Sequence, residues 1–92
     1  MRFTVKRNTG MVGLAMKLDV YVNGEKIDRL ANNESKEFEF TGESVEVGVG
    51  QGFIRSKTIT VKEGETVIAK SSLLGNLFSF FGRSSFYVEI GD

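Results

Sequence analysis

The stretch Leu14-Ala-Met-Lys-Leu-Asp-Val-Tyr-Val-Asn-Gly-Glu-Lys-Ile27 carries the clearest fold signal in this chain. It alternates apolar and polar side chains up to an Asn-Gly pair and then extends again, and a period of two is typical of a half-buried strand. Asn23-Gly24 indicates a hairpin, since both residues tolerate the positive φ angles of a type I′ turn. The apolar face predicted for the first strand holds Leu14, Met16, Leu18, Val20 and Val22.

A two-residue turn also fixes the register of the hairpin. It predicts that Val22 lies opposite Glu25 and that Val20 lies opposite Ile27, which places Ile27 on the apolar face. The return strand, from Glu25 to about Leu30, is mostly charged, and this composition favours the edge of a sheet.

The same alternation continues along the chain in short runs, separated by turn residues at intervals of roughly ten residues. The further runs lie near residues 3–6, 37–40, 45–49, 58–61, 66–70 and 86–90. No linker or low-complexity segment interrupts them. The sequence therefore predicts an all-β fold: one domain over residues 1–92, built as an antiparallel sandwich of seven or eight strands.

The composition bears on chemistry through what it omits, since the 92 residues contain no His, Cys, Trp or Pro. The usual general base near neutral pH and the thiol nucleophile are therefore missing, as are the imidazole and thiolate ligands of metals. The acidic residues Glu37, Glu39, Glu43 and Glu46 alternate with apolar ones, which is typical of a solvated strand face rather than of a metal or acid–base site. We predict that the protein is not an enzyme and needs no cofactor or metal.

The charge balance argues against nucleic acid as a partner, because 12 Lys and Arg residues face 12 Asp and Glu residues. No segment approaches the ~20 apolar residues that span a bilayer. The N-terminus reads as a strand rather than as a signal peptide. The chain as written is predicted to be cytoplasmic, or associated with a cell envelope if it was cut from a longer exported protein.

Several motifs resemble the PEGA family of small β-sandwich domains. The hairpin Asp19–Ile27 is similar to the Asn/Asp-Gly hairpin of that family, and the resemblance continues to about residue 70 through Phe38–Gly42, Ser44–Val49 and Lys57–Glu65. Thr41 stands where the family has Pro. The resemblance implies an immunoglobulin-like or transthyretin-like sandwich. It also implies an accessory module of bacterial envelope or surface proteins, without catalytic residues.

One apolar segment, residues 71–83, breaks the strand pattern. Its large residues fall at helical spacing, which predicts a short helix near 72–82; Phe80 falls off this stripe, so the segment is either a loop or hairpin or leaves apolar surface exposed. Two interpretations stay open: the segment plugs one end of the sandwich, or it forms a docking surface for a protein partner, a second subunit or a membrane interface. The predicted partner-binding residues are Leu73, Leu74, Leu77, Phe78 and Phe81.

A second candidate is the glycine-rich stretch from Gly48 to Arg55, which we expect to be a loop up to Phe53. Its glycines would offer backbone N–H groups to an anion, and Arg55 would clamp that anion. This assigns Gly50, Gly52 and Arg55 as candidate ligand-binding residues. The alternative is a hairpin whose glycines allow twist or a bulge.

Taken alone, the sequence predicts a non-catalytic accessory or protein-interaction domain that binds a protein partner or itself. The alternative function is a carrier for a small apolar ligand or lipid, held between the sheets and covered by residues 73–81. That alternative needs a cavity of at least a few hundred Å³. Peripheral contact with a membrane is a weaker hypothesis, because the apolar segment is flanked by a single basic residue, Arg83.

Overall fold

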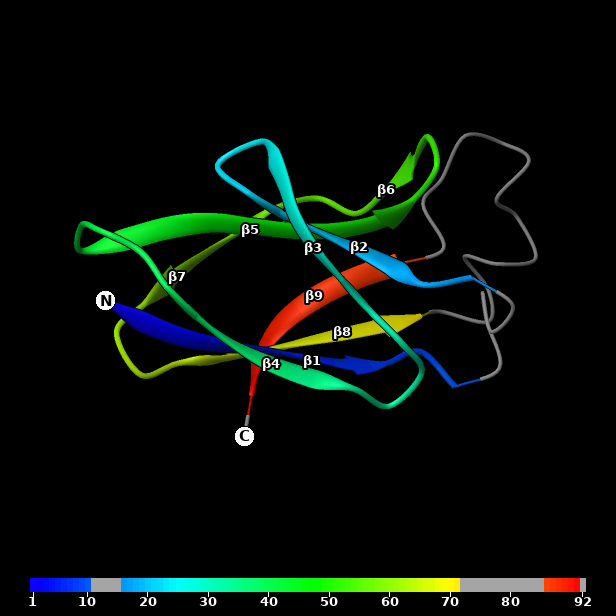
Figure 1. Ribbon diagram of the computed structural model, residues 1–92, viewed down its shortest axis with the longest axis horizontal. Coiled ribbons are helices and arrows are strands. Elements are labelled where there is room, and N and C mark those ends of the chain that lie inside the picture. The colour runs from blue at the N-terminus through cyan, green and yellow to red at the C-terminus, as the bar shows by residue number, and fades with distance from the viewer. Residues whose placement is uncertain (11–15, 72–85, 92) are drawn as a thin grey trace.

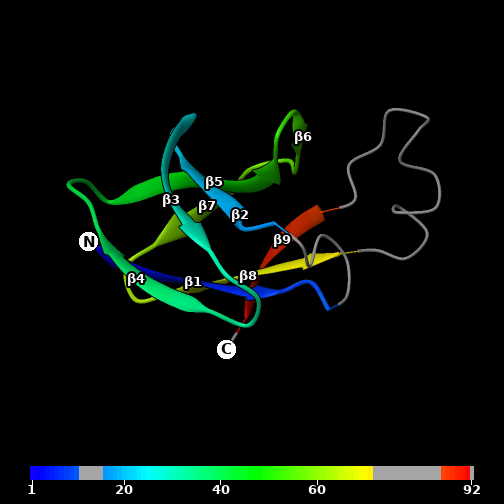
Figure 2. The same cartoon turned by 45° about the vertical axis from the view of Figure 1, so that its right-hand side comes forward.

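The computed structural model describes residues 1–10, 16–71 and 86–91, and within these ranges the chain is all-β (Figure 1). Two sheets lie against each other as two layers, which the turned view also shows (Figure 2). The expected β-sandwich is therefore confirmed, whereas the helix expected near 72–82 falls outside the described residues. The nine strands are β1 (Arg2–Asn8), β2 (Leu18–Val22), β3 (Glu25–Leu30), β4 (Ser35–Glu39), β5 (Ser44–Gln51), β6 (Ile54–Arg55), β7 (Ile59–Lys62), β8 (Thr66–Ser71) and β9 (Phe86–Gly91).

The first sheet has the strand order β4-β1-β8-β9. Its outer pairs are antiparallel, but β1 and β8 run parallel, with Val5 opposite Val67. This pair departs from the purely antiparallel sandwich that we expected. A parallel pair needs a long connection, and here the whole second sheet lies between β1 and β8 in the sequence.

The second sheet has the order β3-β2-β5, and both β6 and β7 pair with the free side of β5. Gly50 pairs with Arg55 and Val47 with Ile59, so residues 56–58 lie opposite residues 48 and 49. One extra residue on this side is a β-bulge. Ser56 holds it: its N–H donates to Val49 O at 2.8 Å and its Oγ accepts from Val49 N at 2.9 Å. β6 and β7 are thus one edge strand with a bulge, which explains why there are nine strands rather than seven or eight.

The predicted hairpin is present between β2 and β3. Asn23 and Gly24 have φ angles of 52° and 85°, as a type I′ turn requires. Val22 lies opposite Glu25, which confirms the first part of the predicted register. The second part is wrong, because the register shifts and Val20 pairs with Asp28. Ile27 is the extra residue of this bulge, although it still packs against the core.

The core lies between the sheets and consists mainly of valines, with Phe3 and Phe86 as its aromatic side chains. The ring of Phe3 lies 5.7 Å from that of Phe38 and 5.9 Å from that of Phe40, centroid to centroid. These contacts tie the ends of β1 and β4 together. The apolar residues with at most 1% exposure are Phe3, Val5, Leu18, Val20, Leu30, Val47, Val49, Val61, Val67 and Ala69.

Candidate functional site

The strand pairing arranges the outer face of the second sheet in rows of side chains. Arg29, Asp19, Gly50 and Arg55 are successive partners across β3, β2, β5 and β6. Residues directly opposite each other project to the same face of a sheet. The row therefore places two arginines on either side of an aspartate, with a glycine in the line.

The neighbouring row on the same face contains Lys26, Tyr21 and Gly48. Lys26 and Arg29 are three residues apart, so a regular strand would point them to opposite faces. The bulge at Ile27 restores the alternation and brings both cations to the outer face. The predicted register would have turned Arg29 inward, and for this reason the sequence alone did not reveal this cluster.

The glycines of β5 leave room over the sheet for larger neighbours. Tyr21 and Asp19 are each only 8% exposed, although the sequence pattern placed them on the solvated face. The guanidinium carbon of Arg55 lies 4.1 Å from the centroid of the Tyr21 ring, within cation–π distance. This stacking fixes the Arg55 plane while its N–H groups remain along the edge of that plane.

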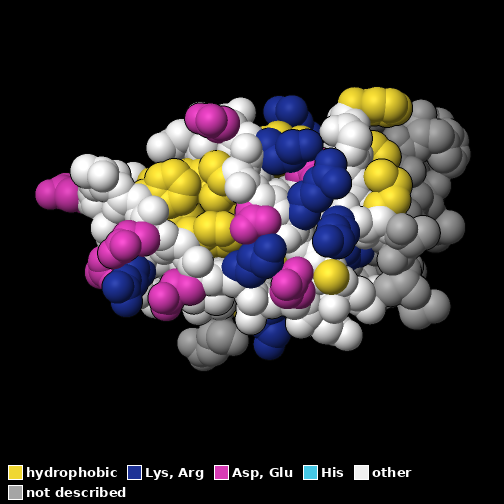
Figure 3. Space-filling model, viewed as in Figure 1, with side chains coloured by type: hydrophobic (Ala, Val, Ile, Leu, Met, Phe, Trp, Pro, Cys, Tyr) yellow, Lys and Arg dark blue, Asp and Glu magenta, His cyan; other side chains and the backbone are white. Residues whose placement is uncertain are grey.

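A pocket of about 470 Å³ opens on this face. Three cations, Lys17, Lys26 and Arg29, line it together with one carboxylate, Asp19, so its lining carries a charge of +2 in a chain whose net charge is zero. Arg55 stands beside the lining, on the ring of Tyr21. Figure 3 shows the corresponding band of Lys and Arg side chains across this face. The residues lining the pocket are Met16, Lys17, Asp19, Tyr21, Lys26, Arg29 and Gly52.

Arg29 is held in place by Asp19, whose Oδ1 lies 3.2 Å from Arg29 Nε. The aspartate side chain is 12% exposed and the arginine side chain 59%. The ion pair runs through Nε, so the terminal nitrogens of the guanidinium remain for other acceptors. A planar fork of this kind matches the two oxygens of a carboxylate or phosphate.

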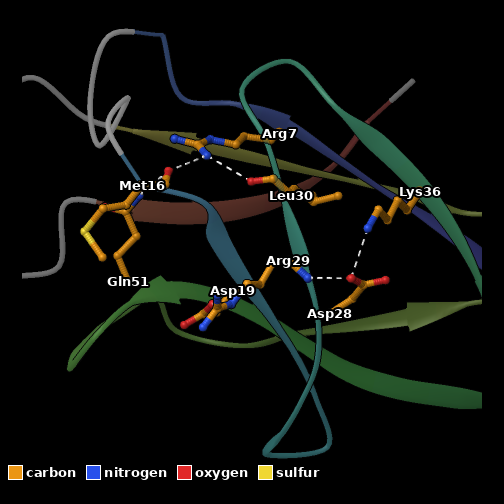
Figure 4. A network of polar contacts seen from close by, with 8 residues as sticks. All are labelled: Arg7, Met16, Asp19, Asp28, Arg29, Leu30, Lys36 and Gln51. Carbon is orange, nitrogen blue, oxygen red and sulfur yellow. Dashed lines mark hydrogen bonds and ion pairs between the residues drawn. The ribbon is translucent and has the colours of Figure 1, made fainter.

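The pocket wall is anchored by a buried arginine of the first sheet, Arg7, which is 1% exposed. Its Nη1 donates to Met16 O at 2.9 Å and to Leu30 O at 3.0 Å, and its Nε donates to Thr9 Oγ1 at 3.0 Å. Figure 4 shows the two contacts of Arg7 Nη1 and the position of Gln51. Gln51 Nε2 donates to Met16 O at 3.1 Å. Burial lowers the pKa of Arg7.

These bonds position the residues next to them in the chain. Met16 precedes Lys17, and Leu30 follows Arg29, so Arg7 holds the backbone beside two of the pocket cations. The period-two pattern places Arg7 on the same face as Phe3 and Val5, so its burial had a signal in the sequence, whereas its acceptors had none.

Asp28 is turned away from this site by its own contacts. Its Oδ1 accepts from Arg29 N at 2.7 Å and from Lys36 Nζ at 3.0 Å, as Figure 4 shows. The backbone N–H of Arg29, and then the ammonium of Lys36, lower the pKa of Asp28, while the Asp28 carboxylate raises the pKa of Lys36. The pair links β3 to β4 across the sandwich edge. The charge of Lys17 also lowers the pKa of Asp28, so Asp28 offsets part of the positive charge at the pocket.

The structure brings together the three residues proposed as an anion cradle. Gly52 lines the pocket, Arg55 stacks on its Tyr21 wall, and Gly50 lies between Asp19 and Arg55. The expected loop is wrong in one respect: β5 extends to Gln51, so only Gly52 and Phe53 form the turn. The five residues proposed as a partner-binding surface, Leu73, Leu74, Leu77, Phe78 and Phe81, lie outside the described residues.

The acidic residues of β4 and β5 lie on solvated surface, as expected. Glu37, Glu39, Glu43 and Glu46 are all exposed. Glu39 pairs with Arg2 at 3.3 Å, and Glu46 accepts hydrogen bonds from Thr58 and Thr60. Within the described ranges no group of three or more potential ligands is placed to hold a metal ion.

Gly50 is the position where a small change tests the geometry of the site. A Cβ there would lie 2.4 Å from Ile54 O and 3.1 Å from Arg55 Cα, so Gly50→Ala must push β6 away from β5. We expect a loss of about 1–3 kcal/mol in unfolding free energy, together with loss of the Arg55–Tyr21 contact. The measurements are urea denaturation and the aromatic ring-current shifts of the Arg55 side chain by NMR.

Gly52→Ala is the matched control, since nothing lies within 4 Å of its added Cβ and only its φ of +61° opposes the change. Its cost should be about 1 kcal/mol, with the Arg55 signals unchanged. Retention of the Arg55–Tyr21 signals in Gly50→Ala would contradict the packing described for the two rows.

Comparison with known proteins adds no relative: no family model matches the chain, nor does any curated protein or solved structure. The resemblance to PEGA domains therefore stays a prediction. In the part of the chain that the structure describes, there is no helix long and apolar enough to cross a membrane.

Proposed function

We propose that this chain is a non-catalytic binding domain that takes an anionic group in the basic pocket on the outer face of its second sheet. The observation that carries the proposal is the charge of the pocket lining, three cations to one carboxylate with Arg55 beside them, in a chain with no net charge. This assignment keeps the accessory role expected from the sequence and supplies it with a binding site.

The lining defines the chemical class of the ligand. Arg29 and the stacked Arg55 each offer a planar fork for oxygens, and Lys17 and Lys26 add charge without demanding one geometry. Tyr21 and Met16 supply apolar wall. A phosphate or carboxylate with a short apolar neighbour fits these features. The four charged groups sit on an open surface, so each contributes modestly, on the order of 0.2–1 kcal/mol.

The test is a titration of the isotope-labelled protein with inorganic phosphate, followed by NMR. We expect backbone shifts at Lys17, Asp19, Tyr21 and Arg29, and an affinity near the millimolar range, about 4 kcal/mol. Sodium chloride at equal ionic strength is the reference, because it screens charges without offering a tetrahedral oxyanion.

Two pocket variants and one control sharpen this titration. Lys26→Gln removes a charge and should weaken phosphate binding by about threefold to fivefold, and Arg29→Lys keeps the charge but removes the fork. Lys62→Gln, on β7 and away from the pocket lining, should bind phosphate as the wild type does. Phosphate shifts no larger than those of sodium chloride, or equal losses in Lys26→Gln and Lys62→Gln, would refute the proposal.

A further inference from the structure

The turn that joins β5 to β6 presents an aromatic side chain to solvent. Gln51 pairs with Ile54, and Gly52 with a φ of +61° opens the two-residue turn, as a type II′ hairpin requires. Phe53 stands at the tip with 97% of its surface exposed. Burying a Phe side chain is worth roughly 1.5–3 kcal/mol, and the fold uses none of this.

A single exposed apolar residue is ordinary, but Phe53 has an apolar neighbour beside the basic pocket. Met16, which lines the pocket, is 58% exposed. The hydrogen bond from Gln51 Nε2 to Met16 O joins the hairpin to the pocket wall. In Figure 3 hydrophobic side chains stand at the β6 end of the band of Lys and Arg.

From this juxtaposition we infer that the pocket face docks on an anionic lipid bilayer, with Phe53 entering the interface and a lipid phosphate held by Lys17, Lys26, Arg29 and Arg55. The inference rests on the proposed function and names its ligand. A bilayer has an apolar interior directly beneath a layer of phosphate groups. This face of the protein presents an apolar side chain, Phe53, beside a group of cations, and so matches both layers. A free anion would use the cations but leave Phe53 in water.

The rest of the charge distribution favours the same orientation. In the view of Figure 3, Asp and Glu side chains predominate at the end where β4 leads to β5, although Arg2 pairs with Glu39 there, and Lys and Arg side chains predominate over β2 and β3. A negative membrane attracts the basic end and repels the acidic end, so the field of the protein turns the pocket toward the surface. Each Lys or Arg near such a surface adds about 1 kcal/mol.

The experiment is co-sedimentation of the full chain with vesicles. Vesicles of equal parts phosphatidylcholine and phosphatidylserine should bind the protein, and vesicles of phosphatidylcholine alone should bind it far less. Added salt should release it, because the charge contribution is screened. Binding that is equal on both vesicle types would overturn the inference.

Three variants separate insertion from charge. Phe53→Ser should lower the partition coefficient by at least about tenfold, because the variant loses part of the free energy of burying one Phe side chain. Lys26→Gln should lower it by about fivefold, because one cation near the anionic surface is lost. Tyr87→Ser, at a 43% exposed aromatic on β9 of the other sheet, should change nothing. An unchanged partition for Phe53→Ser, or an equal loss for Tyr87→Ser, would contradict docking through this face.

The outcomes also distinguish the inference from the proposed function. Binding of inorganic phosphate without binding of phosphatidylserine vesicles would keep the anion pocket and remove the lipid surface. Binding of a poly-glutamate peptide in place of vesicles would assign the pocket to an acidic protein segment and overturn the inference. Failure of phosphate and vesicles together would remove both.

Discussion

Replacing Arg7 with methionine is expected to lower the free energy of unfolding by about 2–5 kcal/mol. Methionine matches the length of the aliphatic stem but cannot donate to Met16 O and Leu30 O, which accept from Arg7 Nη1 at 2.9 and 3.0 Å. A buried charge replaced by an apolar residue is often neutral when both partners are removed. Here the carbonyl acceptors remain in place: Leu30 O loses a buried charged donor, whereas Met16 O keeps its hydrogen bond from Gln51 Nε2.

Urea denaturation measures this loss, and Arg2→Met provides the matched control on the same strand. The side chain of Arg2 is 62% exposed, and within the described residues its one ion pair is with Glu39. Its replacement should therefore cost less than about 1 kcal/mol. Arg7→Met should also weaken phosphate binding, because Lys17 and Arg29 adjoin the two carbonyls. A variant as stable as the wild type would show that Arg7 does not hold the sheets together.

The second large effect is expected for Phe3→Ala, with a loss of about 3–5 kcal/mol. Phe3 is 1% exposed and contacts the rings of Phe38 and Phe40, so truncation leaves a cavity where β1 meets β4. Phe3 belongs to the core between the two sheets, so we expect the neighbouring side chains to fill only part of this cavity.

Phe53→Ala is the control for Phe3→Ala, because it makes the same substitution at an exposed position. At 97% exposure it should alter the unfolding free energy by less than about 0.5 kcal/mol. Both variants are measured by the same denaturation experiment. Equal losses in the two variants, or a loss below about 1 kcal/mol in Phe3→Ala, would contradict the core described here.

The parts of the fold that local chemistry controls could be predicted from the sequence. Asn23-Gly24 specified the turn, and the alternation around Val20 specified the buried face of β2. The bulge at Ile27 could not be predicted, because a period-two pattern assumes an unbroken ladder. The parallel pairing of β1 with β8 likewise depends on contacts between segments remote in sequence.

The candidate site shows the same division. Arg55 and Gly52 were visible as an arginine near glycines, and both lie at the pocket. Asp19 and Tyr21 fall on the polar face of the sequence pattern but are buried, since nothing local reveals that glycines on a neighbouring strand leave space beside them. Arg29 was hidden by the register error, because one residue of slip reverses the side on which it projects.

Two functional hypotheses from the sequence stay predictions. The partner surface around Leu77 and Phe81 lies outside the described residues. The apolar carrier gains no support from the pocket described here, whose lining includes Lys17, Lys26 and Arg29 and which opens on the outer face rather than between the sheets.

The parallel pair in the first sheet has a consequence for the order in which the chain acquires structure. The β2–β3 hairpin joins neighbours in the sequence and closes a short loop, which costs little entropy. β1, at the start of the chain, pairs with β8 only after residues 66–71 have been synthesised. β1 can pair earlier with β4, which brings Phe3 against Phe38, but the side of β1 that faces β8 stays unpaired until that late strand is present. Folding of the complete domain is correspondingly slow, as in other proteins dominated by non-local strand pairing.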